Sequence, residues 1–416
     1  MTKKIMVLIV VVILVVVFLG FFFFFNNDTG GGENGLREGN FFGKIVSTIT
    51  GGERRPQTQD TQSGVIEGSI QDLPQGEGGR LRQLTSLPIS GAVATSTTLP
   101  NTTLTNTVVR YVDRSSGNVF EVDPTSLTQK RISNTTVPGI HEVFWHKDAE
   151  KLLVRYLTDS DVIKSFSAQL KEGEDNIFEL VGDFLKNNIA SITTSPGEDR
   201  LLYVTPINNV TVGIVSDFDG GNADVLFSTP FSEWSVEWVN EDIVALTTKA
   251  AAGIPGYLYF VDISSGAFEK ILGGAQGLTT AVNSAAQSVL FAEGSNSTIR
   301  LQVLDTISRE VRGLPFSTLP EKCVWSNKNL DTLYCGVPSV VRSGLYPDMW
   351  YKGILSFTDD VLEVNTKTGA ASVLIKPSVA TEETIDLMNP FLSPGEDFLF
   401  FTNKKDSTLW GLRLDN

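Results

Sequence analysis

The chain has 416 residues and a formal net charge of −15, from 33 Lys and Arg against 48 Asp and Glu. A protein this acidic lacks the basic surface that binds phosphate backbones, so we expect no nucleic-acid partner. Only two histidines are present, which leaves little room for histidine-based metal or acid–base chemistry. The hydrophobic content of 41% is enough for a folded core and excludes a disordered chain.

The N-terminal residues predict a membrane anchor. Lys3 and Lys4 precede an apolar run from Ile5 to Phe25, which as a helix at about 1.5 Å per residue would span a hydrocarbon core of roughly 30 Å. A cleaved signal peptide also begins with positive charge, but its apolar region is usually shorter, and no small-residue cleavage site follows this run. The lysines place the N-terminus in the cytoplasm, and hence the rest of the chain in the periplasm or at the cell surface.

Residues 26–79 are expected to form a flexible linker, because glycine pairs and triplets interrupt a stretch rich in Thr, Gln and Ser. Within it, residues 40–49 (NFFGKIVSTI) offer a short amphipathic turn for a membrane or a partner. An apolar patch of linker without a role is the alternative.

Residues 80–416 repeat one unit of short β strands and turns. Runs of β-forming residues bounded by Gly, Pro, Asn and Asp, without helical periodicity, predict an all-β domain. The first strand of each unit is expected to end at Leu99, Trp145, Thr194, Trp238, Asn283, Trp325 and Leu392. These positions are 42 to 49 residues apart, except for a last interval of 67. A period of about 40–50 residues with four strands per unit is typical of a β-propeller, here with seven blades.

The last unit is one strand short, and residues 80–86 (RLRQLTS) have no unit of their own. We expect this segment to supply the missing strand, which would close the ring and remove two exposed sheet edges. The tryptophans Trp145, Trp238 and Trp325 recur at one position of the repeat, so we expect them in the core between blades.

Three turns carry a resemblance to a known repeat family. Ser195–Asp199 and Ser393–Asp397, both SPGED, resemble the Ser-Pro-Asp-Gly turn of TolB-like and WD-repeat-like propellers, and Asp217–Asn222 (DFDGGN) is similar to their Asp-x-Asp-Gly turn. The resemblance covers residues 80–416 and implies a fold rather than a function. Only an anchor and a linker are expected ahead of the propeller, so the partners of TolB are not implied.

Possible catalytic and metal motifs have structural interpretations. Asp217–Asp224 lacks the Glu that a calcium loop needs eleven positions after its first Asp, where Ser228 stands. We expect a tight turn with Gly220 and Gly221 at positive φ. His141–His146 is one residue off the H-E-x-x-H zinc pattern and lies on a predicted strand, and no G-x-S-x-G elbow occurs. We therefore expect no metal, no cofactor and no catalytic residue.

Cys323 and Cys335 flank a predicted hairpin centred on Asn329, with Trp325 and Leu333 opposite each other. A cross-strand disulfide is expected outside the cytoplasm, and two buried free thiols are the alternative.

The long last interval contains an insert at residues 338–357, expected between the second and third strands of its blade. Aromatic and arginine side chains on loops are enriched in binding hot spots. The candidate binding residues are Arg342, Tyr346, Asp348, Trp350, Tyr351 and Lys352. The alternative is that Trp350 and Tyr351 fold down and plug the central channel.

The sequence as a whole predicts a membrane-anchored, extracytoplasmic β-propeller that acts as a non-catalytic scaffold for an envelope protein or glycan. A polysaccharide hydrolase or lyase with acidic residues at the channel mouth is the alternative function. That alternative requires two carboxylates about 5–10 Å apart in an open cleft.

Overall fold

The computed structural model divides into two units, residues 1–58 and 59–416. The structure describes residues 67–69, 74–75, 79–98, 105–137, 139–173, 177–197, 199–294 and 298–414. The apolar segment 5–25 and most of the predicted linker lie outside these ranges, so the anchor stays a prediction. Within the described ranges, no helix is long and apolar enough to cross a membrane.

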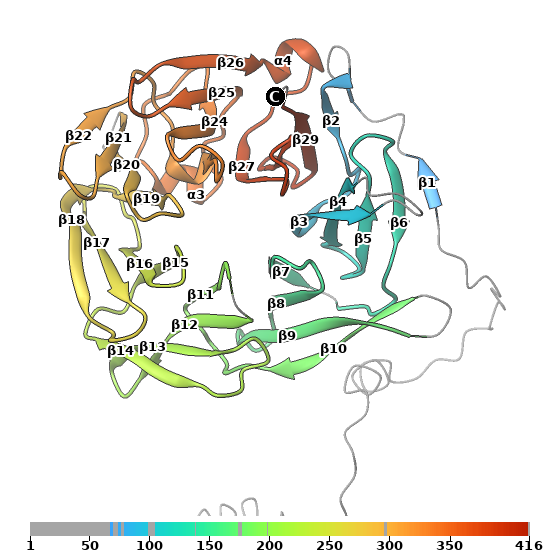
Figure 1. Ribbon diagram of the computed structural model, residues 1–416, viewed down its shortest axis with the longest axis horizontal. Helices are drawn as coiled ribbons and strands as arrows, with labels where there is room; N and C mark the ends of the chain where they lie inside the picture. The colour runs from blue at the N-terminus through green and yellow to red at the C-terminus, as the bar shows by residue number, and fades with distance from the viewer. Residues whose placement is uncertain are drawn as a thin grey trace, which may run out of the picture. The chain divides into compact units, whose positions relative to one another are not determined.

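The described residues form seven antiparallel sheets around a common axis, one for each predicted blade (Figure 1). From the axis outward, blades 1 to 3 contain β3 (Ile89–Thr98), β4 (Thr105–Asp113), β5 (Val119–Val122) and β6 (Thr128–Arg131); β7 (Ile140–Trp145), β8 (Lys151–Leu157), β9 (Ile163–Glu172) and β10 (Phe178–Phe184); and β11 (Ser191–Thr194), β12 (Arg200–Ile207), β13 (Val210–Asp217) and β14 (Asp224–Thr229).

Blades 4 to 7 repeat this order. They contain β15 (Trp234–Trp238), β16 (Ile243–Thr248), β17 (Pro255–Asp262) and β18 (Phe268–Gln276); β19 (Thr279–Val282), β20 (Ser288–Gly294), β21 (Ile299–Asp305) and β22 (Val311–Gly313); β23 (Cys323–Trp325), β24 (Thr332–Pro338), β25 (Asp359–Asn365) and β26 (Ala371–Ile375); and β27 (Leu387–Leu392), β28 (Phe398–Asn403), β29 (Leu409–Arg413) and β2 (Leu81–Gln83). The part of the chain that the structure describes also contains the short helices η3 (Pro320–Lys322), α3 (Asp348–Tyr351) and α4 (Pro377–Ala380).

The prediction of a seven-bladed all-β propeller is confirmed by this topology. The innermost strands β7, β11, β15, β23 and β27 end at the residues that mark the repeat, and β19 ends one residue before Asn283. Leu99 lies outside the described residues. The three recurring tryptophans are buried, and Trp325 Nε1 donates a hydrogen bond to the carbonyl of Ala281 in the preceding blade.

The ring is closed by strands from its two ends. β2 pairs antiparallel with β29 and becomes the outermost strand of blade 7, so residues from the N-terminal side complete the C-terminal blade (Figure 1). Leu81 and Leu84 are fully buried in this blade and its neighbour. Part of the predicted linker is also a strand, because β1 (Glu67–Ser69) pairs with the outer edge of β6.

The turns that carry the family resemblance have clear local causes. Ser393 Oγ accepts hydrogen bonds from the backbone N–H groups of Asp397 and Phe398, at 3.1 and 3.0 Å, and so holds the hairpin between β27 and β28. In the β13–β14 turn, Gly220 has φ 87°, but the second positive φ belongs to Asn222 (46°) and not to Gly221. The prediction for Gly221 is wrong because an Asn also tolerates the left-handed region.

Replacing Leu81 by Ala tests the closing strand. We expect the free energy of unfolding to fall by about 2–5 kcal/mol, because the change leaves a cavity in a fully buried site. Leu87→Ala is the matched control, since Leu87 is exposed and surface changes alter stability by less than about 0.5 kcal/mol. Urea denaturation measures both, and deletion of residues 80–86 should lower the unfolding temperature further. Equal stability of Leu81→Ala and the parent would contradict a stabilising role for the strand.

Candidate functional site

The insert between β24 and β25 lies across several blades. Because successive strands are antiparallel, the loop between the second and third strands and the connection to the next blade lie at the same end of the sheets, here named the upper face. In blade 4, the backbone N–H of Ala252 donates to Asp348 Oδ2 at 2.6 Å. In blade 5, a Cβ at Gly294 would lie 2.4 Å from the carbonyl oxygen of Tyr346. Only glycine permits this close approach.

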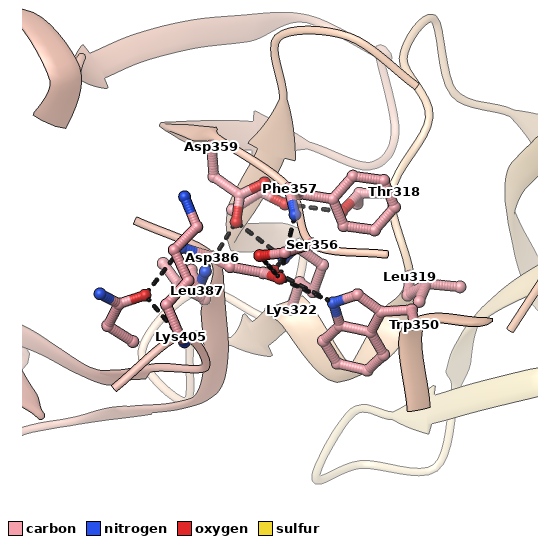
Figure 2. A network of polar contacts seen from close by, with 12 residues as sticks. Thr318, Leu319, Lys322, Trp350, Ser356, Phe357, Asp359, Asp386, Leu387 and Lys405 are labelled. Atoms are coloured by element: carbon pink, nitrogen blue, oxygen red, sulfur yellow. Dashed lines mark hydrogen bonds and ion pairs between the residues drawn. The ribbon is translucent and has the colours of Figure 1, made fainter. Parts of the chain in front are cut away.

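A buried cluster of charges lies beneath the insert (Figure 2). Lys322 at the end of η3 places its Nζ 2.7 Å from Asp359 Oδ2 and 2.5 Å from Asp386 Oδ1, and all three side chains are 0% exposed. Lys322 precedes β23, Asp359 begins β25, and Asp386 precedes β27. The cluster therefore joins the connection into blade 6, the end of the insert and the connection into blade 7. We name these three residues the charge cluster.

The insert contributes the donors that surround Asp386 (Figure 2). Trp350 Nε1 donates to both carboxylate oxygens, at 3.1 and 3.2 Å, and Ser356 Oγ and the Phe357 N–H donate to Oδ2, at 2.8 and 3.0 Å. The rings of Trp350 and Phe357 also lie 5.2 and 5.0 Å from Lys322 Nζ, within cation–π range. These contacts fix the end of the insert and its short helix α3.

The two carboxyl groups of the charge cluster differ in acidity. Burial raises the pKa of Asp359 to about 6, and the attraction of Lys322 offsets only part of that effect. Burial acts in the same direction on Asp386, but Lys322 and the donors from Phe357 and Trp350 hold its pKa below the ordinary value. Two carboxylates thus share one cation, and Asp359 takes up a proton first as the pH falls.

The six candidate residues of the insert divide into two groups. Trp350 is only 4% exposed and Tyr346 is fully buried, with its hydroxyl bonded to the carbonyl of Arg342. The carboxylate of Asp348 accepts the hydrogen bond from Ala252 in blade 4. The structure leaves Arg342, Tyr351 and Lys352 exposed, although the Tyr351 hydroxyl also donates to Glu321. The buried aromatic residues therefore support the loop, and the exposed side chains form its surface.

A central cavity of about 910 Å³ is lined by the innermost strands of blades 1, 2, 6 and 7. The residues that line it include no member of the insert, so the contacts of the insert run to neighbouring blades and not into this cavity. Glu142 is the one carboxylate among the lining residues, and it already forms a 3.0 Å ion pair with Arg155. The described lining residues therefore offer no second carboxylate to form the pair that a glycosidase requires.

Two other carboxyl groups near the inner strands have raised pKa values. Burial raises the pKa of Glu237 on β15 to about 7, and the N–H of Val282 opposes this only in part. Burial also raises the pKa of Glu321, which accepts the Tyr351 hydroxyl. Glu237 therefore accepts a hydrogen bond from the next blade, and Glu321 accepts one from the insert. Both carboxyl groups connect separate parts of the fold.

The described residues contain one group of side chains with metal-ligand spacing. Atoms of His146, Asp148 and Asp199 lie within 4.8 Å of one another. His146 Nδ1 is 2.9 Å from Asp148 and Nε2 is 3.3 Å from Asp199, while Lys151 also bonds Asp199. These partners satisfy the carboxylates, so we interpret the group as packing between the turns of blades 2 and 3.

The structure joins Cys323 and Cys335 in a disulfide. The two residues are directly opposite each other in β23 and β24, as are Trp325 and Leu333. The bridge therefore lies within blade 6, and Cys323 directly follows Lys322 of the charge cluster.

Sequence reasoning missed the charge cluster. A signal was present, because Lys322 directly precedes a strand that is buried, and a lysine there needs a partner. Its partners Asp359 and Asp386 lie 37 and 64 residues further along the chain, so no local motif connects them. The three residues come into contact only because blades 6 and 7 pack together.

No known protein family and no curated protein matches this sequence. A solved structure of an oligogalacturonate lyase in complex with manganese is similar, with 12% identity over 85% of this chain and 99% of that chain and a TM-score of 0.51. TolB from Acinetobacter baumannii has 14% identity over 69% of this chain and 65% of that chain (TM-score 0.41). The Swd1 β-propeller domain from Myceliophteria thermophila has 10% identity over 80% and 98% (TM-score 0.48). At such identities the lyase similarity shows the fold alone. The propeller topology agrees with the TolB-like and WD-repeat-like repeat read from the sequence.

Replacing both cysteines by Ser tests the disulfide. We expect the free energy of unfolding to fall by about 3 kcal/mol, the chain-entropy value for a loop of this length, because the bridge spans 12 residues of sequence. Denaturation with and without reductant measures this effect. Reductant should lower the midpoint of the parent and leave that of the variant unchanged, whereas free thiols in non-reducing peptide maps of the parent would contradict the bridge.

Glu237 predicts a pH dependence of stability. Its pKa of about 7 in the folded protein lies above its ordinary value of 4.5, so across this window the folded state retains a proton that the unfolded state has released. The free energy of unfolding should therefore fall as the pH rises through the window. Glu237→Gln should remove this part of the slope, and Glu233→Gln, at an exposed position of the same blade, should retain it. Equal slopes for Glu237→Gln and the parent, measured by urea denaturation, would contradict the prediction.

Proposed function

We propose that the protein is a membrane-anchored, extracytoplasmic binding scaffold without catalytic activity, which recognises another envelope protein through the exposed side of its insert. Residues 5–25 would hold it in the membrane, with the N-terminus in the cytoplasm. The observation that carries the proposal is that the one large departure from the repeat is a surface loop held by a fully buried charge cluster.

The physical argument concerns rigidity. Burying Lys322 and two carboxylates costs desolvation free energy, and such clusters contribute less to stability than an apolar core of similar volume. What the cluster supplies is a fixed geometry for the insert, because the Asp386 carboxylate receives its hydrogen bonds from Trp350, Ser356 and Phe357 only when these residues are in place. A loop that is rigid before binding loses less conformational entropy on association.

The exposed side of the insert has the composition of a protein-binding surface. Val340 is 69% exposed and Ile354 is 67% exposed, and Leu345 and Tyr351 are about half exposed. Arg342 and Lys352 lie within the same segment. Exposed aliphatic side chains bounded by cations favour a protein over a glycan, since a glycan offers little apolar area to bury.

The alternative of a polysaccharide hydrolase or lyase receives no support from the described cavity. The one carboxylate that lines it, Glu142, is paired with Arg155. The similarity to an oligogalacturonate lyase concerns the fold, and folds of this kind carry many functions.

Chemical cross-linking in the native membrane, followed by mass spectrometry, tests the proposal. We compare the parent with a Val340→Asp, Ile354→Asp double variant, because a charge at each position opposes the burial of an apolar contact. The expected result is that a protein cross-linked to the parent is reduced at least tenfold in the variant, equivalent to about 1.4 kcal/mol of binding free energy.

The control variant is Ile307→Asp. Ile307 is 77% exposed but lies in the turn between β21 and β22, at the opposite end of the sheets. Recovery of the partner should be unchanged in this control. If the same partners persist in the double variant, the insert is not the recognition element, and the predicted linker and membrane segment become the candidates.

A further inference from the structure

The charge cluster brings together an amine and a carboxyl group in a site closed to bulk solvent. Lys322 Nζ lies 2.5 Å from Asp386 Oδ1, both side chains are 0% exposed, and the rings of Trp350 and Phe357 cover the amine. Holding an amine and a carboxyl group in contact, away from bulk solvent, lowers the barrier to their condensation to an amide. We propose that Lys322 and Asp386 form an intramolecular isopeptide bond between Nζ and Cγ, with Asp359 carrying the protons. This inference does not depend on the proposed function.

The surroundings of Asp386 suit it to be the group that is attacked. Its oxygens accept hydrogen bonds from Trp350 Nε1, Ser356 Oγ and the Phe357 N–H, at distances from 2.8 to 3.2 Å. The same donors can hold the negative charge that develops on oxygen when the amine adds to Cγ. Fixed donors of this kind act as an oxyanion hole.

The position of Asp359 suits it to carry protons. Its Oδ2 lies 2.7 Å from Lys322 Nζ and also accepts the N–H of Leu387. Its Oδ1 is buried without a hydrogen-bond partner among the described residues, which leaves that oxygen free to bind a proton. Because burial raises the pKa of this carboxyl to about 6, both protonation states are accessible near neutral pH.

The step balances without any other reactant. Asp359 takes a proton from the Lys322 ammonium, and the neutral amine attacks Cγ of Asp386. Asp386 Oδ1, which lies 2.5 Å from Nζ, receives two of the three ammonium protons, one directly and one that Asp359 passes back through the nitrogen, and leaves as water when its bond to Cγ breaks. The third proton stays on the amide nitrogen, Asp359 returns to its starting state, and nothing is oxidised or reduced.

A second lysine–aspartate pair shows why burial matters. Lys367 Nζ lies 2.7 Å from Asp331 Oδ2, a contact of similar length, but the lysine side chain is 74% exposed. Bulk water solvates the charges of an exposed pair, so this contact remains an ordinary surface ion pair. It provides a matched control within the same molecule.

The proposed bond would tie two adjacent blades. Lys322 precedes the first strand of blade 6 and Asp386 precedes the first strand of blade 7, so the bond would enclose all of blade 6 and its insert. The disulfide of Cys323 begins at the next residue. The insert would then be held by covalent links on the upper face as well as by packing.

Mass spectrometry of the reduced full-length protein tests the proposal. The parent should be lighter than its sequence mass by one water, about 18 Da. Trypsin should not cut after Lys322, and a peptide containing Lys322 should be found joined to one containing Asp386. Lys322→Arg and Asp386→Ala should restore the full mass, Asp359→Asn should strongly reduce the joined fraction, and Lys367→Arg should retain it.

The Asp386→Asn variant keeps the proposal testable if Asp386→Ala fails to fold. Its amide should still be attacked but would release ammonia, about 17 Da, in place of water, which would identify residue 386 as the acyl donor. A parent that has its full sequence mass and is cut by trypsin after Lys322 overturns the proposal. A peptide that joins Lys322 to Asp359 overturns the assignment of the two carboxyl groups.

Discussion

The structure around blade 6 depends on one constraint, which is that the charge of Lys322 has no access to water. A buried ammonium requires compensating carboxylates and further hydrogen bonds to satisfy them. Asp359 and Asp386 supply the first, and Trp350, Ser356 and Phe357 of the insert supply the second. The position of the insert, the burial of its tryptophan and the contact between blades 6 and 7 all follow from meeting this requirement.

The remainder of the ring has a simpler physical basis. The inner strands of the blades pack against neighbouring blades, and the recurring tryptophans are buried there. In a closed ring every blade packs against two neighbouring blades. The pairing of β2 with β29 completes the last blade with strands from opposite ends of the domain. Closure by non-local strands couples the stability of residues 81–83 to that of the C-terminal blade.

The insert shows how a regular scaffold acquires a distinct surface. Its aromatic residues Tyr346 and Trp350 face the blades, and its aliphatic residues Val340 and Ile354 face solvent. This is the reverse of what aromatic enrichment in a loop suggests, because Trp350 and Phe357 cover the buried lysine and Tyr346 stacks on Phe357. The binding proposal therefore rests on the smaller apolar side chains and the flanking cations, which remain accessible.

The sequence by itself determined the features that are local or periodic. The number of blades, the ends of the innermost strands and the pairing of Cys323 with Cys335 across a hairpin follow from spacing, since the residues concerned are near neighbours along the chain or recur in each unit. Tertiary structure alone decided the charge cluster and the orientation of Trp350. Lys322 and Asp386 are separated by 64 residues, and Gly294 lies against Tyr346 only because blades 5 and 6 are packed together. Such contacts have no local motif that connects their residues, because the constraint that selects them is the burial created when the ring assembles.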